Sequence, residues 1–169
     1  AWLQAKATDW ASSVEALTKT AHCHPQAAYL AMQMSLQAEW QFVRRVTQGT
    51  LDDFVPIEAA LKQGFLPALF GEGQVTAELR DLTQLPVKAS GMALPNPNSM
   101  DPQAYAVSAR AVHHLKAALL GDTFFCADQH AAEARQVRAQ TRKAARATAL
   151  RVSDALIAPL PPKAKRTLL

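Results

Sequence analysis

The stretch TLDDFVPIEAALKQGFLPALF (residues 50–70) shows most clearly how this 169-residue chain is built. Apolar side chains recur along it at steps of three and four residues: Phe54, Ile57, Leu61, Phe65 and Leu69. That spacing places them on one side of an α-helix. Gly64 and Pro67 disfavour a helix interior, so we expect a kink or break near the end of this helix.

Asp52 and Asp53, at the start of this stretch, have two possible roles. Adjacent aspartates between apolar residues are also how polymerases and two-metal nucleases present metal-binding carboxylates. A polymerase pair has an aromatic residue two positions before the first aspartate and β-forming flanks. Here that position is Thr50, and the following residues keep the helical period. We therefore interpret Asp52 and Asp53 as helix caps, whose negative charge suits the free N–H groups of a helix N-terminus.

The rest of the chain repeats the helical pattern. We expect a first helix that ends near TAHCHP (residues 20–25), a second that begins with Pro25, and a short helix capped by Thr76. A further helix should end at Gly121, and a long one should span roughly residues 128–158. Five proline and glycine residues interrupt the pattern over residues 85–102: Pro86, Gly91, Pro95, Pro97 and Pro102. The sequence thus predicts an all-α fold, an irregular bundle of about five to six helices with a Pro/Gly-rich extended segment at 85–102.

The charge is unevenly distributed. Residues 1–130 contain 9 basic and 12 acidic residues, a net charge of −3, whereas residues 131–169 contain 9 basic and 2 acidic residues, a net charge of +7. We expect residues 1–130 to form a helical domain. Residues 131–169 would form a basic helix with a Pro/Lys-rich tail that continues into a further region. An acidic body with a basic end favours an anionic partner, nucleic acid first.

The predicted basic helix carries the candidate nucleic-acid-binding residues. Helical spacing places Arg135, Arg138, Arg142 and Arg146 on one side, with Lys143 beside them. Such a stripe follows a phosphate backbone without reading bases. The alternative is a solvated helix face, and the sequence leaves both interpretations open. Aromatic residues lie elsewhere in the chain, so base stacking on this helix is not expected.

A metal site is a weaker possibility. His22, Cys23 and His24 are adjacent, and Cys126 and His130 lie one helical turn apart. Zinc needs four ligands with suitable geometry, so these groups would have to meet across the fold. We favour an ordinary inter-helix loop and a partly buried cysteine, and we expect no metal and no cofactor in this segment.

Enzyme and membrane motifs are missing from the sequence. It contains no phosphate-binding loop, dinucleotide-binding, metalloprotease or serine-hydrolase motif, and we assign no catalytic residue. No run approaches eighteen apolar residues, and residues 1–6 lack the pattern of a signal peptide. We expect an intracellular protein, nuclear or cytoplasmic and not secreted, with no membrane partner and with free cysteines.

Four blocks, in this order, resemble one family. They are HPQAAYLAMQMSLQAEWQFVRRV (24–46), FVPIEAALKQGFLPALFG (54–71), LPVKASGMALPNPN (85–98) and the weaker AVHHLKAALLGDTFF (111–125). Together they resemble the region just after the catalytic domain in reverse-transcriptase-like proteins of eukaryotic retroelements. The resemblance covers roughly residues 8–130. The third block departs from the family pattern at Ser90, where the family has the first glycine of a pair.

The resemblance implies descent from an RNA-directed DNA polymerase, and it implies that residues 1–130 form a helical, thumb-like or connector domain. It also implies that the catalytic aspartates and their divalent metal ions belong to an upstream domain. The expected partners are then an RNA–DNA hybrid or other nucleic acid duplex, bound independently of sequence, and the rest of the parent polypeptide.

Two functions remain open from the sequence. The first is a non-catalytic helical segment that supports the polymerase and contacts template–primer nucleic acid through phosphates. The second is a helical protein–protein interaction module with no nucleic-acid role, which docks through one apolar stripe: Tyr29, Met32, Leu36, Trp40 and Val43. A solvent-exposed stripe would indicate a docking surface, whereas a buried stripe would belong to the domain's own core. We favour the core.

Overall fold

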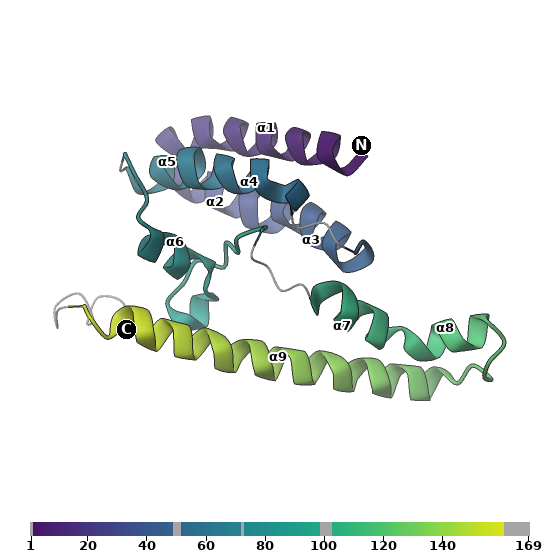
Figure 1. Cartoon of the computed structure of the whole chain (residues 1–169). Coiled ribbons are helices and arrows are strands. Elements are labelled where there is room, and N and C mark those ends of the chain that lie inside the picture. Colours follow the sequence, from purple (N-terminus) through teal and green to yellow (C-terminus); the bar gives the residue numbers. More distant parts are fainter. Residues whose placement is uncertain (1, 49–51, 72, 99–102, 161–169) are drawn as a thin grey trace.

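The computed structural model describes residues 2–48, 52–71, 73–98 and 103–160 (Figure 1). Within these ranges the regular structure consists of helices, and no strand occurs. The all-α prediction is therefore confirmed, and the seven α-helical segments in the described ranges roughly match the expected number of about five to six. Residues 99–102 of the predicted extended segment, and the expected tail at 161–169, lie outside the described residues.

Three long helical segments make up the main body. The first is α1 (Trp2–Cys23). The second begins as α2 (Pro25–Ala31) and continues through the π-helical turn η1 (Met32–Leu36) into α3 (Gln37–Val46). The third begins with the 3-10 turn η2 (Asp52–Phe54) and continues through α4 (Val55–Ala60) and the π-helical turn η3 (Leu61–Phe65) into α5 (Leu66–Phe70). Figure 1 shows α4 and α5 lying alongside α1, with α2 and α3 packed against them. The predicted start at Pro25 is confirmed.

The remaining elements lie below this body. They are α6 (Ala77–Gln84), the 3-10 turn η4 (Val87–Ala89), α7 (Gln103–Ala111), α8 (His113–Leu119) and α9 (Ala127–Ile157). The Thr76 hydroxyl accepts a hydrogen bond from the Leu79 N–H at 3.2 Å, as predicted for the cap of α6. The single helix expected before Gly121 is instead divided at Val112, whose backbone leaves the helical region. Among the described residues, no helix has the length and apolar character needed to cross a membrane.

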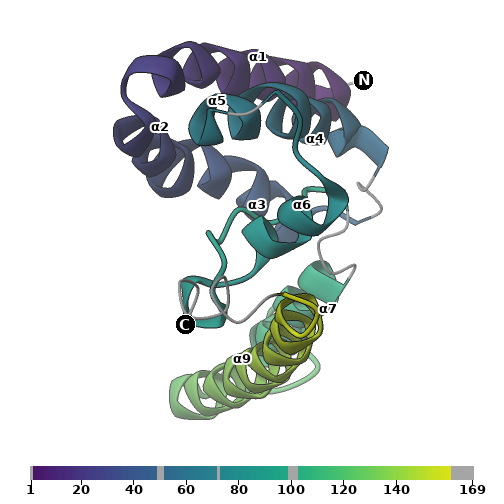
Figure 2. The same ribbon diagram turned by 90° about the vertical axis from the view of Figure 1, so that its left-hand side faces the viewer.

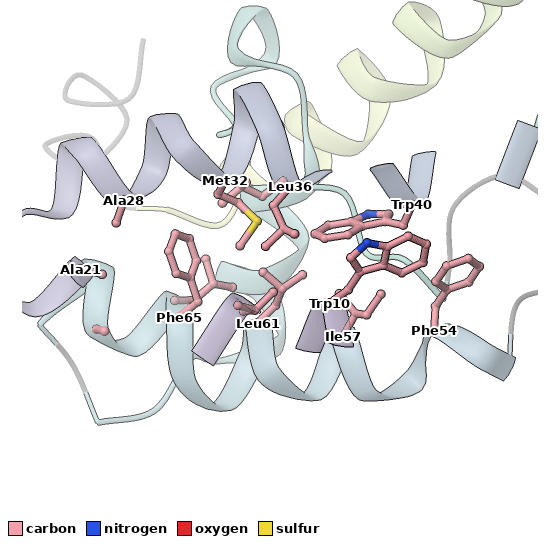
Figure 3. Packing of buried hydrophobic residues seen from close by; sticks show 14 of the residues in the cluster. Trp10, Ala21, Ala28, Met32, Leu36, Trp40, Phe54, Ile57, Leu61 and Phe65 are labelled. Atoms are coloured by element: carbon pink, nitrogen blue, oxygen red, sulfur yellow. The ribbon is translucent and has the colours of Figure 1, made fainter. Parts of the chain in front are cut away.

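The core lies where the three long segments meet (Figure 3). The Trp10 ring packs edge-on to Trp40 and stacked on Phe54, both with centroids 6.3 Å apart. Its indole N–H donates to Glu39 at 2.8 Å, so the polar atom of this core residue is satisfied. Most of the two predicted apolar stripes is buried: Met32, Leu36, Trp40, Val43, Phe54, Ile57, Leu61 and Phe65. The stripe of α2–α3 is therefore mainly core and not a docking surface.

The expected break near Pro67 does not occur. Instead the segment passes through η3, where the Leu66 N–H donates to the Leu61 carbonyl five residues back. Pro67 then falls in the first turn of α5, where a missing N–H is tolerated. The π-helical turn therefore accommodates the proline within one continuous helical segment.

One buried arginine joins α6 and residues 85–98 to the body. The Arg80 guanidinium donates to both carboxylate oxygens of Glu58 on α4, at 2.8 and 2.6 Å. Its remaining Nη1 donates to the Leu94 carbonyl at 2.7 Å and to the Thr83 hydroxyl at 3.0 Å. Arg80 is only 4% exposed, so one side chain links α4, α6 and the Pro/Gly-rich segment inside the protein.

The same segment is also bound to α2–α3. The Tyr29 hydroxyl and the Gln33 amide both donate to the Met92 carbonyl at 2.7 Å, and the Gln37 amide donates to the Ala93 carbonyl at 3.1 Å. Burial raises the pKa of Tyr29, which keeps the phenol protonated as a donor. Residues 85–98 thus have a fixed path although most of them are not helical.

The backbone at Ser90 and Gly91 explains why glycine is favoured at this point of the segment. Ser90 has a left-handed conformation, with φ of 61°, which glycine adopts at the lowest cost. At Gly91 an added Cβ would overlap the carbonyl oxygen of Leu85. The close approach of the two backbones therefore requires glycine at position 91, while position 90 tolerates a small residue.

Gly91→Ala should destabilise the fold by about 2 kcal/mol or more, because the new methyl group meets backbone and cannot be relieved by a side-chain rotation. Thermal unfolding followed by circular dichroism measures the loss. The control is Gly73→Ala, where an added Cβ meets nothing within 4 Å. Equal unfolding temperatures for the two variants would contradict the proposed close approach.

Arg80→Met should cost about 3–5 kcal/mol, because it leaves the largely buried Glu58 carboxylate without its cation. Chemical denaturation measures the change in the free energy of unfolding. Arg45→Met is the control, since it removes an exposed arginine, and it should change stability by about 0.5 kcal/mol or less. A similar small effect at Arg80 would show that the ion pair does not hold these elements together.

Candidate nucleic-acid interface

The predicted basic residues all lie on α9, the longest helix described. Arg135, Arg138, Arg142, Lys143 and Arg146 are exposed along its middle. The helix begins at Ala127, so the expected boundary at residue 131 falls inside one continuous helix. Figures 1 and 2 show α9 passing beneath the main body, with α7 and α8 beside its N-terminal half.

The two ends of α9 are buried on different faces. Ala134 is buried in the half that packs on α7 and α8, whereas Ser153 and Ile157 are buried near the end that passes α6 and η4. Arg142 and Ser153 are eleven residues apart, as are Arg146 and Ile157. Eleven residues make three helical turns plus about 20°, so the two residues of each pair lie on nearly the same side of α9. The arginines therefore lie on the face of α9 that, further along, is buried.

A groove lies between this face of α9 and the turn η4. It has a volume of about 830 Å³. Arg142, Lys143 and Arg146 line its α9 wall, and Lys88 of η4 lies on the opposite wall. The sequence did not indicate Lys88, a single lysine in a Pro/Gly-rich segment far from α9 in the chain. Lys88 reaches the groove only because η4 packs beside α9 in the folded protein.

The groove is positively charged. Its lining contains four basic residues and no acidic one. The remaining lining residues are alanine, proline and leucine: Pro86, Ala89, Ala145, Ala147, Ala149 and Leu150. The ion pair between Arg80 and Glu58 lies inside the body, away from the groove lining. The arrangement therefore attracts an anionic ligand and offers apolar surface between the charges.

Beyond the groove the basic stripe continues on open helix. Arg135 and Arg138 are exposed but do not line the groove. The Arg135 Nε donates to the Ala131 carbonyl at 3.1 Å, so its side chain is directed along α9. The stripe thus has an open part, towards α8, and an enclosed part opposite Lys88.

Asp52 and Asp53 lie in η2, the first turn of the segment that continues as α4. Asp52 is exposed and Asp53 is half-buried, while Phe54 occupies the N-cap position of α4. Both carboxylates therefore stand at a helix start, as expected. Their hydrogen bonding to free N–H groups there stays a prediction.

The two predicted groups of cysteine and histidine residues do not meet each other. The end of α1, with His22 and Cys23, lies at the opposite end of the molecule from the α8–α9 turn (Figure 1). Within the described ranges, no three histidine, cysteine or acidic residues form a group that could hold a metal ion. At the α8–α9 turn, the backbone N–H of Cys126 instead donates to the His114 Nε2 at 3.1 Å. His114 thus holds the turn that precedes α9.

Comparisons with known proteins add no assignment. No family model, no curated protein and no solved structure matches this chain.

Proposed function

We propose that this chain is a non-catalytic helical segment of a retroelement reverse transcriptase, and that it grips template–primer nucleic acid through phosphate contacts. The observation that carries the proposal is the basic groove, in which Lys88 faces Arg142, Lys143 and Arg146 with no acidic residue in the lining. Four cations on two walls favour an extended polyanion over a small neutral ligand.

The chemistry of the stripe favours phosphate contacts over base recognition. Arginine presents paired N–H donors that match phosphate oxygens. The lining contains no aromatic residue on which bases would stack, and Ala145 and Ala149 offer no polar atom to a base edge. A polymerase must hold a duplex whose sequence changes with every template, and sequence-independent contacts suit that need.

Three of the four blocks of the resemblance also support the proposal. The first two fall on α2–α3 and α4–α5, which pack together in the core, and the third is hydrogen-bonded to Tyr29 of α2 and, through Arg80 of α6, linked to Glu58 of α4. These three blocks therefore belong to one packed unit, whereas the fourth lies on α8 and the exposed turn before α9. We assign no catalytic residue to this chain, and the metal-binding aspartates of the polymerase would belong to a separate domain.

A second candidate function is protein–protein interaction, and one specific surface favours it. The turn between α8 and α9 exposes Leu119, Leu120 and Phe124, the last of which is 96% exposed. Neighbouring apolar side chains of this size mark a contact surface more often than an ordinary exposed face. The partner that would contact this turn is the rest of the parent polypeptide.

Replacing Arg135, Arg138, Arg142 and Arg146 together by glutamine should weaken binding to an RNA–DNA hybrid. The slope of log affinity against log salt concentration should also become shallower, by about 0.9 for every phosphate that the variant no longer neutralises. Fluorescence anisotropy at several salt concentrations measures both quantities.

The matched control removes four other exposed positive charges, those of Lys19, Arg45, Lys62 and Lys116. It should leave affinity and slope close to those of the original chain. If both variants lose affinity equally, net charge alone accounts for binding and the α9 surface is not the site.

A further inference from the structure

We propose that the groove between η4 and α9 holds a single-stranded segment of nucleic acid, next to a duplex held on the open part of α9. The proposal rests on the proposed function and identifies which form of nucleic acid each part of the stripe contacts. It follows from the shape of the surface around Arg142 and Arg146, which is concave and not convex.

A duplex does not fit this concave surface. The major groove of B-form DNA, about 12 Å wide, admits only a protruding helix of about 10–12 Å diameter, and the A-form major groove of an RNA–DNA hybrid is narrower. Here the arginine face of α9 is opposed by η4, so that face cannot enter a duplex groove. A single strand is narrow enough to pass between the two walls, and its phosphates would meet Lys88 on one side and Arg142 or Arg146 on the other.

The walls suit a flexible strand. Pro86 and Ala89 on one side, and Ala145, Ala149 and Leu150 on the other, give apolar surface against which sugars and base faces pack. None of these side chains has a hydrogen-bonding group, so packing is independent of base identity. The groove thus combines positive charge with small apolar side chains, which take the place of the aromatic stacking residues common in sequence-independent single-strand sites.

The open part of the stripe supplies the other half of the site. Arg135 and Arg138 lie on the same side of α9 as Arg142 and Arg146 but outside the groove lining. Phosphates of a duplex can reach them there without entering the groove. A nucleic acid that changes from duplex to single strand along α9 would therefore use the whole stripe, as a primed template with an unpaired extension does.

The experiment compares a blunt RNA–DNA hybrid with the same hybrid carrying a single-stranded extension of about ten nucleotides. Fluorescence anisotropy at fixed salt gives the ratio of the two affinities. The original chain should bind the extended hybrid several-fold more tightly. Lys88→Gln should reduce that ratio, because the charge that it removes faces the groove and not the open part of α9.

A matched pair of variants tests the groove by shape and without altering charge. Ala144 and Ala145 are adjacent exposed residues of α9, but only Ala145 lines the groove. Ala145→Phe should fill it and abolish the gain from the extension, whereas Ala144→Phe should retain the gain. Circular dichroism checks that both variants keep the same helix content.

The outcomes separate this inference from the proposed function. Equal binding of blunt and extended hybrids by the original chain, or a gain that survives Ala145→Phe, would overturn the single-strand site while duplex binding stands. If neither hybrid binds, the proposed function itself is wrong.

Discussion

The two-point contact between Arg80 and Glu58 is the interaction on which the arrangement of this protein depends. The core of α1, α2–α3 and α4–α5 is held by apolar packing, which is strong but does not fix the direction in which the following chain leaves. Arg80 does fix it, because its planar guanidinium binds Glu58 on α4 and the Leu94 carbonyl at the same time. Breaking such a buried pair leaves a charge without a partner, so α6 and residues 85–98 have one favourable position.

That position has a consequence at the candidate site. Hydrogen bonds from Tyr29, Gln33 and Gln37 to Met92 and Ala93 hold the far side of the same segment. The turn η4 lies between Arg80 and Met92 in the sequence. Both of these residues are fixed by hydrogen bonds, and they therefore support the turn that places Lys88 in the groove. A cation on a supported turn loses less conformational freedom on binding than one on a free loop. The buried polar contacts thus place one of the four groove cations.

Periodicity predicted much of the fold. Apolar steps of three and four residues predicted α1, α2–α3 and α4–α5, proline or threonine marked the starts of α2 and α6, and a long helix was expected at roughly 128–158, where α9 lies. Local signals gave the wrong continuity in two places. Pro67 suggested a break where η3 lets the helix continue, and residues 103–119 suggested one helix where Val112 divides it. Both features depend on how the helix packs against its neighbours, which the helix propensity of the residues does not describe.

By itself, the sequence determined that this protein is helical and that its positive charge is concentrated on one helix. Both follow from local spacing and composition. The tertiary structure decided which element the charged face of α9 lies opposite. Because Ser153 and Ile157 are buried on the side of α9 that carries Arg142 and Arg146, those arginines face η4 and form one wall of a groove. Lys88 joins them from more than fifty residues away in the chain, a pairing that only packing creates.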